Sequence, residues 1–152
     1  MKGILTRLRE KFASTAQPIE SVPLPKSGGT NVLVVDDDNA VCRIVQRMLS
    51  DQHYQVQTSQ SVADAILAIE QSFDAYVIDY KLPDGSGLDV AERIRSKGTE
   101  PPIILMSGYD ASSVTSRAEK FSISDFLQKP FSRETICKAV RKVIGSPNVA
   151  LA

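Results

Sequence analysis

Runs of apolar residues alternate with segments of helical periodicity from residue 31 onward. Continuous apolar runs are typical of strands covered on both faces, and three occur, at residues 32–35, 75–78 and 103–106. Residues 54–58 alternate between apolar and polar, and residues 123–127 form an interrupted run, as expected of strands at a sheet edge. The pattern therefore predicts five strands, of which two lie at the edges of a sheet.

An amphipathic helix is predicted after each strand, because apolar residues recur there at spacings of three and four. In chain order, the helical faces carry Val41, Ile44, Val45, Met48 and Leu49; Ala65, Ile66 and Ile69, with Ser61 as the N-cap; Leu88, Ala91 and Ile94; Val114, Ala118 and Phe121, the weakest set; and Ile136, Val140, Val143 and Ile144. Strict alternation of strands and helices predicts right-handed βαβ units and a parallel sheet. Three interior and two edge strands fit the order 2-1-3-4-5, so we expect an α/β fold: a doubly wound, five-stranded parallel sheet with five helices, of the flavodoxin type.

The first thirty residues differ in composition from the rest of the chain. Residues 14–30 contain three prolines and two adjacent glycines, which is typical of a linker. Apolar residues at helical spacing precede it, interleaved with basic ones: Ile4, Leu5, Leu8 and Phe12. This segment could be a basic amphipathic helix that contacts a membrane surface or a partner. It could also be a frayed, solvated tail, because so short a helix is marginal in water. The expected organisation is a basic segment and linker at 1–30, a folded domain at 31–145 and a tail at 146–152.

Charge and composition narrow the function classes. Eighteen basic residues balance eighteen acidic ones, so no net charge draws the chain to nucleic acid, and we expect no direct nucleic-acid binding. The balance is uneven along the chain, since residues 1–30 carry a charge of +3 and the remainder −3. No apolar run is long enough for a transmembrane segment, and no signal peptide is present. The two cysteines form no disulfide framework, and we expect a cytoplasmic protein.

Carboxylates follow the predicted strands at the edge where open α/β sheets bind ligands. Asp36 and Asp37 follow the first strand, Asp79 the third, Ser107 the fourth, and Lys129 comes after the fifth. Clustered carboxylates repel one another, and Mg²⁺ is the cation that prefers such oxygen ligands. A carboxylate can act as a phosphoryl nucleophile, with a lysine and a hydroxyl holding the phosphoryl oxygens. The residues therefore favour magnesium-dependent phosphoryl transfer at this edge.

Four motifs carry a family resemblance, in this order: Val-Val-Asp-Asp-Asp at 34–38, Asp-Tyr-Lys-Leu-Pro-Asp-Gly-Ser-Gly-Leu at 79–88, Met-Ser-Gly at 106–108 and Phe-Leu-Gln-Lys-Pro-Phe at 126–131. Together they resemble the receiver (CheY-like) domain of bacterial two-component response regulators. The resemblance covers residues 31–145, and the seven residues that follow are too few for an output domain. It therefore implies a single-domain response regulator, a signalling switch whose only chemistry is self-phosphorylation and autodephosphorylation.

The resemblance assigns a role to each residue of the acidic edge. It implies that Asp79 accepts a phosphoryl group from a sensor histidine kinase or a histidine phosphotransfer protein. Asp36 and Asp37 would hold Mg²⁺, Asp37 directly, together with Asp79 and the backbone carbonyl of Lys81. Lys129 would pair with the phosphoryl group and precede a cis proline.

The resemblance also implies a switch and an output surface. Ser107 would bond the phosphoryl oxygen, and Phe126 would follow it between exposed and buried rotamers. The altered surface, formed by the fourth helix, fifth strand and fifth helix, would bind an unknown downstream protein. Lys81 and Tyr109 occupy positions that tune the lifetime of the aspartyl phosphate, and we expect the bulk of Tyr109 to lengthen it.

Alternative interpretations remain for several of these residues. The chain could be a degenerate receiver that acts as a scaffold, or a phosphatase of the haloacid dehalogenase type with Asp36 as its nucleophile. Asp38 is expected to cap the next helix rather than to bind metal. Ser122 stands where a glycine is usual and would have to adopt positive φ. Cys42 and Cys137 are expected to be buried on the same face of the sheet.

Overall fold

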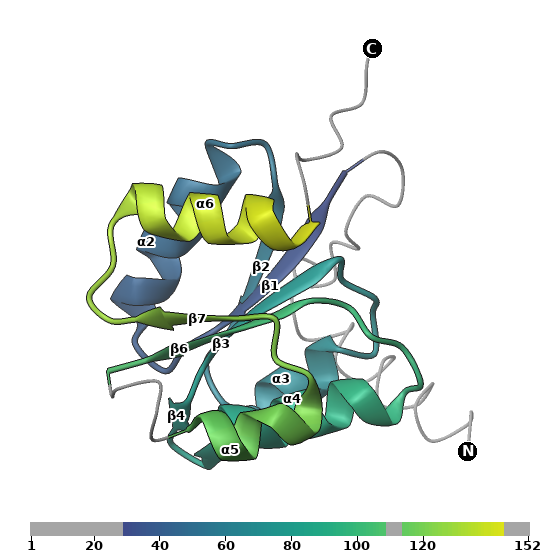
Figure 1. The fold of residues 1–152 in the computed structure, drawn as a ribbon. Helices are drawn as coiled ribbons and strands as arrows, with labels where there is room; N and C mark the ends of the chain where they lie inside the picture. The colour runs from purple at the N-terminus through teal and green to yellow at the C-terminus, as the bar shows by residue number, and fades with distance from the viewer. Residues whose placement is uncertain (1–28, 109–113, 145–152) are drawn as a thin grey trace, which may run out of the picture.

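The computed structural model describes residues 29–108 and 114–144, and these form a parallel sheet between two layers of helices (Figure 1). The strands of the sheet are β1 (Asn31–Val35), β2 (Gln55–Ser59), β3 (Ala75–Asp79), β6 (Ile103–Ser107) and β7 (Asp125–Gln128). Their order is β2-β1-β3-β6-β7, and every neighbouring pair is parallel. This is the predicted order 2-1-3-4-5. The predicted N-terminal segment and C-terminal tail lie outside the described residues, apart from Gly29 and Thr30.

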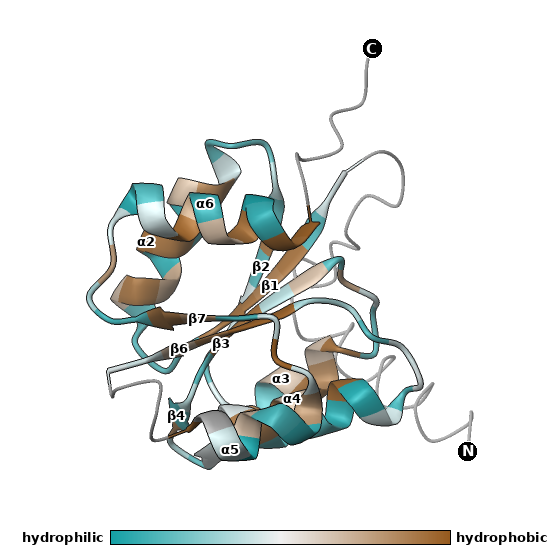
Figure 2. Ribbon diagram, viewed as in Figure 1, coloured by the Kyte–Doolittle hydropathy of each residue, from teal (hydrophilic) through white to brown (hydrophobic). Residues whose placement is uncertain are grey.

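Burial along the strands follows their place in the sheet. β3 and β6 are buried at every residue and β1 from Val32 onward, whereas β2 and β7 keep partly exposed positions. Figure 2 shows the hydrophobic colour concentrated in the central strands. The prediction of three interior and two edge strands is therefore confirmed.

Five α-helices cover the two faces of the sheet in the described part of the chain. They are α2 (Asn39–Ser50) and α6 (Arg133–Ile144) on one face, and α3 (Val62–Ala68), α4 (Gly87–Ser96) and α5 (Thr115–Ala118) on the other (Figure 1). Each face has its own hydrophobic core, built from alternate strand residues and the apolar sides of the helices above them. Cys42 and Cys137 are both buried and belong to the α2 and α6 side, as predicted.

Polar side chains fix where several helices begin. The Asp38 carboxylate accepts hydrogen bonds from the backbone N–H groups of Ala40 and Val41, which confirms its predicted role as an N-cap. Ser61 caps α3 through the N–H of Asp64, as predicted. Each cap satisfies donors that the first helical turn cannot pair internally.

The structure differs from the prediction in some local elements. A short antiparallel hairpin of β4 (Lys81–Leu82) and β5 (Gly85–Ser86) follows β3. The fourth helix is only one turn long and continues as a 3-10 turn, η2 (Glu119–Phe121). Ser122 ends this turn with φ of 53°, so the residue that stands in place of the usual glycine does adopt a left-handed conformation. The last strand begins at Asp125 rather than at residue 123, because residues 122–124 connect the 3-10 turn to the strand.

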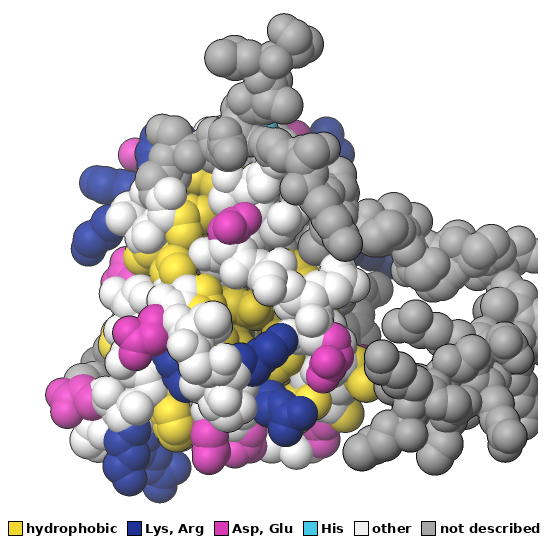
Figure 3. Space-filling model, turned by 90° about the vertical axis from the view of Figure 1, so that its right-hand side faces the viewer, with side chains coloured by type: hydrophobic (Ala, Val, Ile, Leu, Met, Phe, Trp, Pro, Cys, Tyr) yellow, Lys and Arg dark blue, Asp and Glu magenta, His cyan; other side chains and the backbone are white. Residues whose placement is uncertain are grey.

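Charged side chains of both signs are interspersed on the surface that Figure 3 presents, with hydrophobic side chains between them. This face therefore carries no large area of a single charge. Among the described residues, no helix has the length and apolar character needed to cross a membrane.

Candidate functional site: an acidic pocket at the carboxyl edge of the sheet

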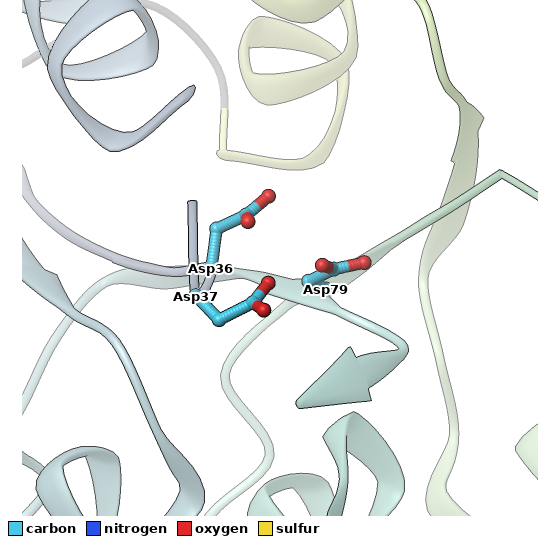
Figure 4. Close-up of side chains that lie close together, drawn as sticks. All are labelled: Asp36, Asp37 and Asp79. Carbon is cyan, nitrogen blue, oxygen red and sulfur yellow. The ribbon is translucent and has the colours of Figure 1, made fainter. Parts of the chain in front are cut away.

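Three carboxylates meet where the two central strands β1 and β3 end. Asp36 and Asp37 directly follow β1, and Asp79 is the last residue of β3. One oxygen from each side chain lies within 4.8 Å of the others, and Figure 4 shows the three groups around one space. Asp36 and Asp79 are buried, whereas Asp37 is exposed. The sequence prediction that these residues converge is confirmed, because neighbouring parallel strands end at the same edge.

Lys129 bridges the two buried carboxylates. Its Nζ donates hydrogen bonds to Asp36 Oδ2 at 2.5 Å and to Asp79 Oδ2 at 3.1 Å. The other oxygen of Asp36 accepts a hydrogen bond from the backbone N–H of Asp38 at 2.9 Å. Both oxygens of Asp36 are thus engaged, and Asp36 acts as the anchor for the lysine.

The surroundings of this pocket change the pKa of two of its groups. Burial, and then repulsion from Asp36, raise the pKa of Asp79, and the hydrogen bond from Lys129 only partly opposes them. For Lys129, burial disfavours the ammonium, but hydrogen bonds to Asp36 and Asp79 outweigh it and raise its pKa. Lys129 is therefore charged at neutral pH, and it counterbalances part of the negative charge of the cluster.

The donor set fits a magnesium ion. Three carboxylates within a few ångströms leave negative charge that a single lysine does not neutralise, and all the available donors are oxygens. Asp37 is exposed, so one side of the cluster is open to solvent, and Mg²⁺ normally keeps some of its waters. Asp38 is not part of this set, because its side chain caps α2.

The other predicted site residues lie on the neighbouring strands. Ser107 ends β6 and is buried, and its carbonyl oxygen accepts a hydrogen bond from the N–H of Lys129 at 2.8 Å. Phe126 lies in β7, where it pairs in register with Leu105 and packs, half-buried, against the core on the α4 side. Tyr109 lies outside the described residues.

Lys129 precedes a cis proline, and Lys81 is an exposed residue of the β4–β5 hairpin. The Lys129–Pro130 peptide bond is cis, as the family resemblance implied. Lys81 pairs with Ser86 across the hairpin. It follows Asp79 by two residues in the chain, so its backbone lies close to the end of β3.

Gly87 is a residue of the site that the sequence analysis missed. Its backbone N–H donates to the carbonyl of Tyr80 at 2.8 Å, which folds the hairpin back onto the end of β3. A Cβ at this position would lie only 2.3 Å from the carbonyl oxygen of Asp79. The signal available in the sequence was a glycine at the first position of a helix, where glycine has no conformational advantage over other residues.

Asp84, between the two strands of the hairpin, holds a helix in place. Its two carboxylate oxygens accept hydrogen bonds from the backbone N–H groups of Val62 and Ala63, at 2.7 and 2.9 Å. The hairpin that carries Lys81 is therefore tied to the start of α3. A contact across 22 residues leaves no local pattern in the sequence.

The thiol of Cys42 borders the site but is unsuited to chemistry there. Its Sγ donates to the carbonyl oxygen of Asp36 at 3.2 Å. Burial, followed by the charge of Asp36, raises the pKa of Cys42 to about 11. A thiol that remains protonated at neutral pH is a poor nucleophile and a poor metal ligand.

Known proteins share this fold and this sequence pattern. Residues 32–141 match the family described as the response regulator receiver domain. The photosynthetic apparatus regulatory protein RegA of Rhodobacter capsulatus is 32% identical over 111 residues, which are 72% of this chain and 60% of RegA. The response regulator MprA of Mycobacterium sp. (strain KMS) is 33% identical over 114 residues, 74% of this chain and 50% of MprA. The chain thus spans about half to three-fifths of the length of these relatives.

Solved structures give the same result. The chemotaxis protein CheY4 of Vibrio cholerae superposes with a TM-score of 0.72 at 25% identity, over 75% of this chain and 98% of CheY4. The protein TrrA of Thermotoga maritima, solved in complex with Mg²⁺ and BeF, superposes with a TM-score of 0.67 at 26% identity, over 75% of this chain and 98% of TrrA. The acidic pocket, the fold and these similarities agree, and the chain belongs to the family of response regulator receiver domains of two-component systems.

Proposed function

We propose that this chain is a phosphorylation-controlled switch in which Asp79 accepts a phosphoryl group. The observation that carries the proposal is the bridge from Lys129 to Asp36 and Asp79 beside the exposed carboxylate of Asp37. Receiver domains are signalling switches rather than conventional enzymes, and the donor would be a phosphohistidine on a sensor kinase or a phosphotransfer protein.

The proposed transfer is a single displacement at phosphorus. A carboxylate oxygen of Asp79 attacks the phosphorus atom, the bond from phosphorus to the histidine nitrogen breaks, and the electron pair leaves with the imidazole. The product is an acyl phosphate on Asp79. Lys129 already lies 3.1 Å from Asp79, so its ammonium can follow the charge onto the phosphoryl oxygens without a large movement.

Magnesium completes this site in the proposal. Asp36, Asp37, Asp79 and the carbonyl of Lys81 would hold the ion, which neutralises charge on the phosphoryl oxygens when it is bound. The complex of TrrA with Mg²⁺ and BeF is consistent with such an arrangement, since TrrA resembles this chain over most of its length.

The signal would leave the site through Ser107 and Phe126. Ser107 ends the strand next to Asp79, so its hydroxyl can bond a phosphoryl oxygen and move toward it. Phe126 is only half-buried in β7, and in the proposal it changes rotamer when Ser107 moves. The surface of α5, β7 and α6 would then bind a downstream protein that prefers one of the two states. Lys81, which is exposed, and Tyr109 would set the lifetime of the phosphorylated form.

Acetyl phosphate labelling with Mg²⁺, followed by intact-mass measurement, tests the proposal. The natural chain should gain one phosphoryl group that is stable in acid and labile in base. Asp79→Asn should take none. Asp38→Asn is a matched control, because asparagine caps a helix as well as aspartate does and the residue lies outside the metal site.

Two results would contradict the proposal. An absence of label on the natural chain, with Mg²⁺ present and the fold intact, would favour the scaffold interpretation. Labelling that persists in Asp79→Asn but disappears in Asp36→Asn would favour a phosphatase with Asp36 as nucleophile. The structure argues against the latter, since the side chain of Asp36 is fully buried, whereas a nucleophile must reach the phosphorus atom of its substrate.

A further inference from the structure

An apolar groove on α2 lies beside the acidic pocket, and none of its apolar side chains supplies a group to the chemistry of the proposed phosphoryl transfer. Its volume is about 480 Å³, and it is bounded by one stripe of α2 and by the loop after β7. Its apolar lining consists of Val41, Ile44, Val45, Met48, Pro130 and Phe131, and Lys129 forms part of the wall. Lys129 therefore borders both the groove and the phospho-acceptor site.

Ile44 makes this groove unusual for a solvent-facing surface. Its relative exposure is 53%, and only one other large hydrophobic side chain in the described part of the chain, Leu67, is exposed. Leu67 lies on α3, on the opposite side of the sheet. An exposed apolar residue in the middle of an apolar groove indicates a surface that binds another apolar group.

The same chain contains a segment of matching character. Ile4, Leu5, Leu8 and Phe12 would form one apolar stripe if residues 4–12 were helical. A helix of this length is marginal in water by itself and is stabilised when its apolar side packs against a surface. An amphipathic helix in an apolar groove is a recurrent mode of recognition.

The intervening chain has the length needed to reach the groove. Residues 13–28 supply a tether of 16 residues with three Pro, three Ser and one Gly. A flexible chain of this length has an end-to-end distance of about 20–24 Å, and the prolines extend it further. The strand β1 advances about 13 Å from Asn31 to Val35, at about 3.3 Å per residue, and α2 begins four residues later. Because the tether is longer than this strand, the segment can reach the groove, and its effective concentration there is of the order of millimolar.

Charge also favours this pairing. Residues 4–12 carry Arg7, Arg9 and Lys11 against a single Glu10, whereas the chain beyond residue 30 has a charge of −3. At the start of α2, beside the groove, the carboxylates of Asp37 and Asp38 are exposed. The basic side chains Arg47 and Arg133 near the other end of α2 are each paired with Asp51. The groove is therefore open to a basic segment at its acidic end.

We propose that residues 4–12 bind as a short amphipathic helix in the groove between α2 and the Lys129–Phe131 loop of the same molecule. The bound segment covers Ile44 and lies against Lys129, at the rim of the pocket that contains Asp79. This docking requires no phosphoryl group, so it stands or falls separately from the proposed phosphorylation.

Paramagnetic relaxation in the full-length chain tests the docking. A nitroxide is attached through Ala13→Cys, and labelling is selective because Cys42 and Cys137 are buried. The amide signals of α2 from Val41 to Met48, and that of Phe131, should lose most of their intensity. The reference is the spectrum recorded after the nitroxide has been reduced. The amides of α3 around Leu67 should keep theirs.

Matched substitutions separate this contact from a general effect of the label. Ile44→Glu in the groove and Leu8→Glu in the segment should each restore the α2 signals. Leu67→Glu, an equivalent change on the opposite side of the sheet, should leave the signal loss on α2 unchanged. Both Ile44 and Leu67 are exposed, so the fold should survive the changes, and the amide spectrum checks this directly.

Three outcomes would overturn the proposal. Undiminished α2 signals would mean that the groove serves a partner from outside the chain. Equal losses on α2 and α3 would mean that the segment samples the whole surface. A further experiment mixes chain that carries the nitroxide but no ¹⁵N with ¹⁵N-enriched chain that carries no nitroxide. A loss of α2 amide signals in that mixture would mean that a second copy occupies the groove.

Discussion

The backbone of Gly87 packs directly against the carbonyl group of Asp79, at a distance that leaves no space for a side chain. A Cβ at Gly87 would lie 2.3 Å from that oxygen and 2.9 Å from a methyl group of Ile78. The obstructing atoms belong to the backbone of β3 and to a buried side chain, so neither can move cheaply. The β4–β5 hairpin is thus seated on the strand that ends in the phospho-acceptor.

We expect Gly87→Ala to destabilise the fold and to slow labelling of Asp79. Overpacking of this kind costs about 1–3 kcal/mol, and relief of the clash would displace either the hairpin or the end of β3. Chemical denaturation measures the first effect and the rate of acetyl phosphate labelling the second. Gly108→Ala is the control for stability, since an added Cβ there meets nothing within 4 Å. A Gly87→Ala variant as stable as the natural chain would contradict this packing argument.

Replacing Lys129 by methionine should lower stability at neutral pH. The change leaves Asp36, which is fully buried, without its cation. Breaking a fully buried pair costs about 3–5 kcal/mol, but the Lys129 side chain is 25% exposed and water can replace part of the interaction, so we expect about 1–3 kcal/mol. Denaturation at pH 7 without Mg²⁺ measures the loss. Lys138→Met, on the exposed side of α6, should change stability little; equal effects of both substitutions would refute the role of the bridge.

The sheet and the acidic pocket could be predicted because both follow from local patterns. Continuous apolar runs distinguish β1, β3 and β6 from the edge strands, and the parallel order then places Asp36, Asp37 and Asp79 at one edge. The same strand order placed Lys129 at this edge, but its contact with Asp36 joins residues 93 positions apart and could not be predicted from local pattern.

What the sequence analysis missed depends on tertiary contacts. Two-residue strands such as β4 and β5 have no periodicity to detect. Arg95 donates hydrogen bonds to the carbonyl oxygens of Phe121, Ser122 and Pro101, and so fixes the turn that shortens the fourth helix. In the sequence, Arg95 is recognisable only as a basic residue near the end of a helix. Its contacts with the turn are visible only in the folded structure.

Ser122→Gly should stabilise the protein. Ser122 has φ of 53°, a conformation that costs a residue with a Cβ about 1 kcal/mol, although glycine loses more entropy on folding. We therefore expect a net gain of about 0.5–1 kcal/mol in the free energy of unfolding. Ser96→Gly, in the last turn of α4, makes the same chemical change at a helical position and should have the opposite sign. A loss of stability in Ser122→Gly would show that the side chain of Ser122 contributes more than its backbone conformation costs.

Asp84 should make the fold sensitive to acid. Hydrogen bonds from the N–H groups of Ala63 and Val62 lower its pKa below the ordinary value of 3.8, so its stabilisation is complete above that pH and is lost as the pH falls through the folded-state pKa. Asp84→Asn should therefore be less stable than the natural chain at pH 7, and the difference should shrink on acidification. Thermal unfolding between pH 7 and pH 3 follows it. Glu92→Gln on the exposed side of α4 controls for the change in net charge, and a difference that grows toward acid would contradict the assignment.

Mg²⁺ should stabilise the chain through Asp37. An ion that binds only the folded state adds about 2.7 kcal/mol at one hundred times its dissociation constant, so the melting temperature should rise with the concentration of Mg²⁺. Asp37→Asn removes the exposed carboxylate of the cluster and should abolish most of this rise. Asp38→Asn removes a neighbouring charge of the same sign but keeps the cap on α2, and it should retain the response. If the two variants respond equally to Mg²⁺, the ion is acting through general screening of negative charge, and the acidic pocket is not its site. If only Asp37→Asn loses the response, the ion is held by the carboxylates that surround Asp79.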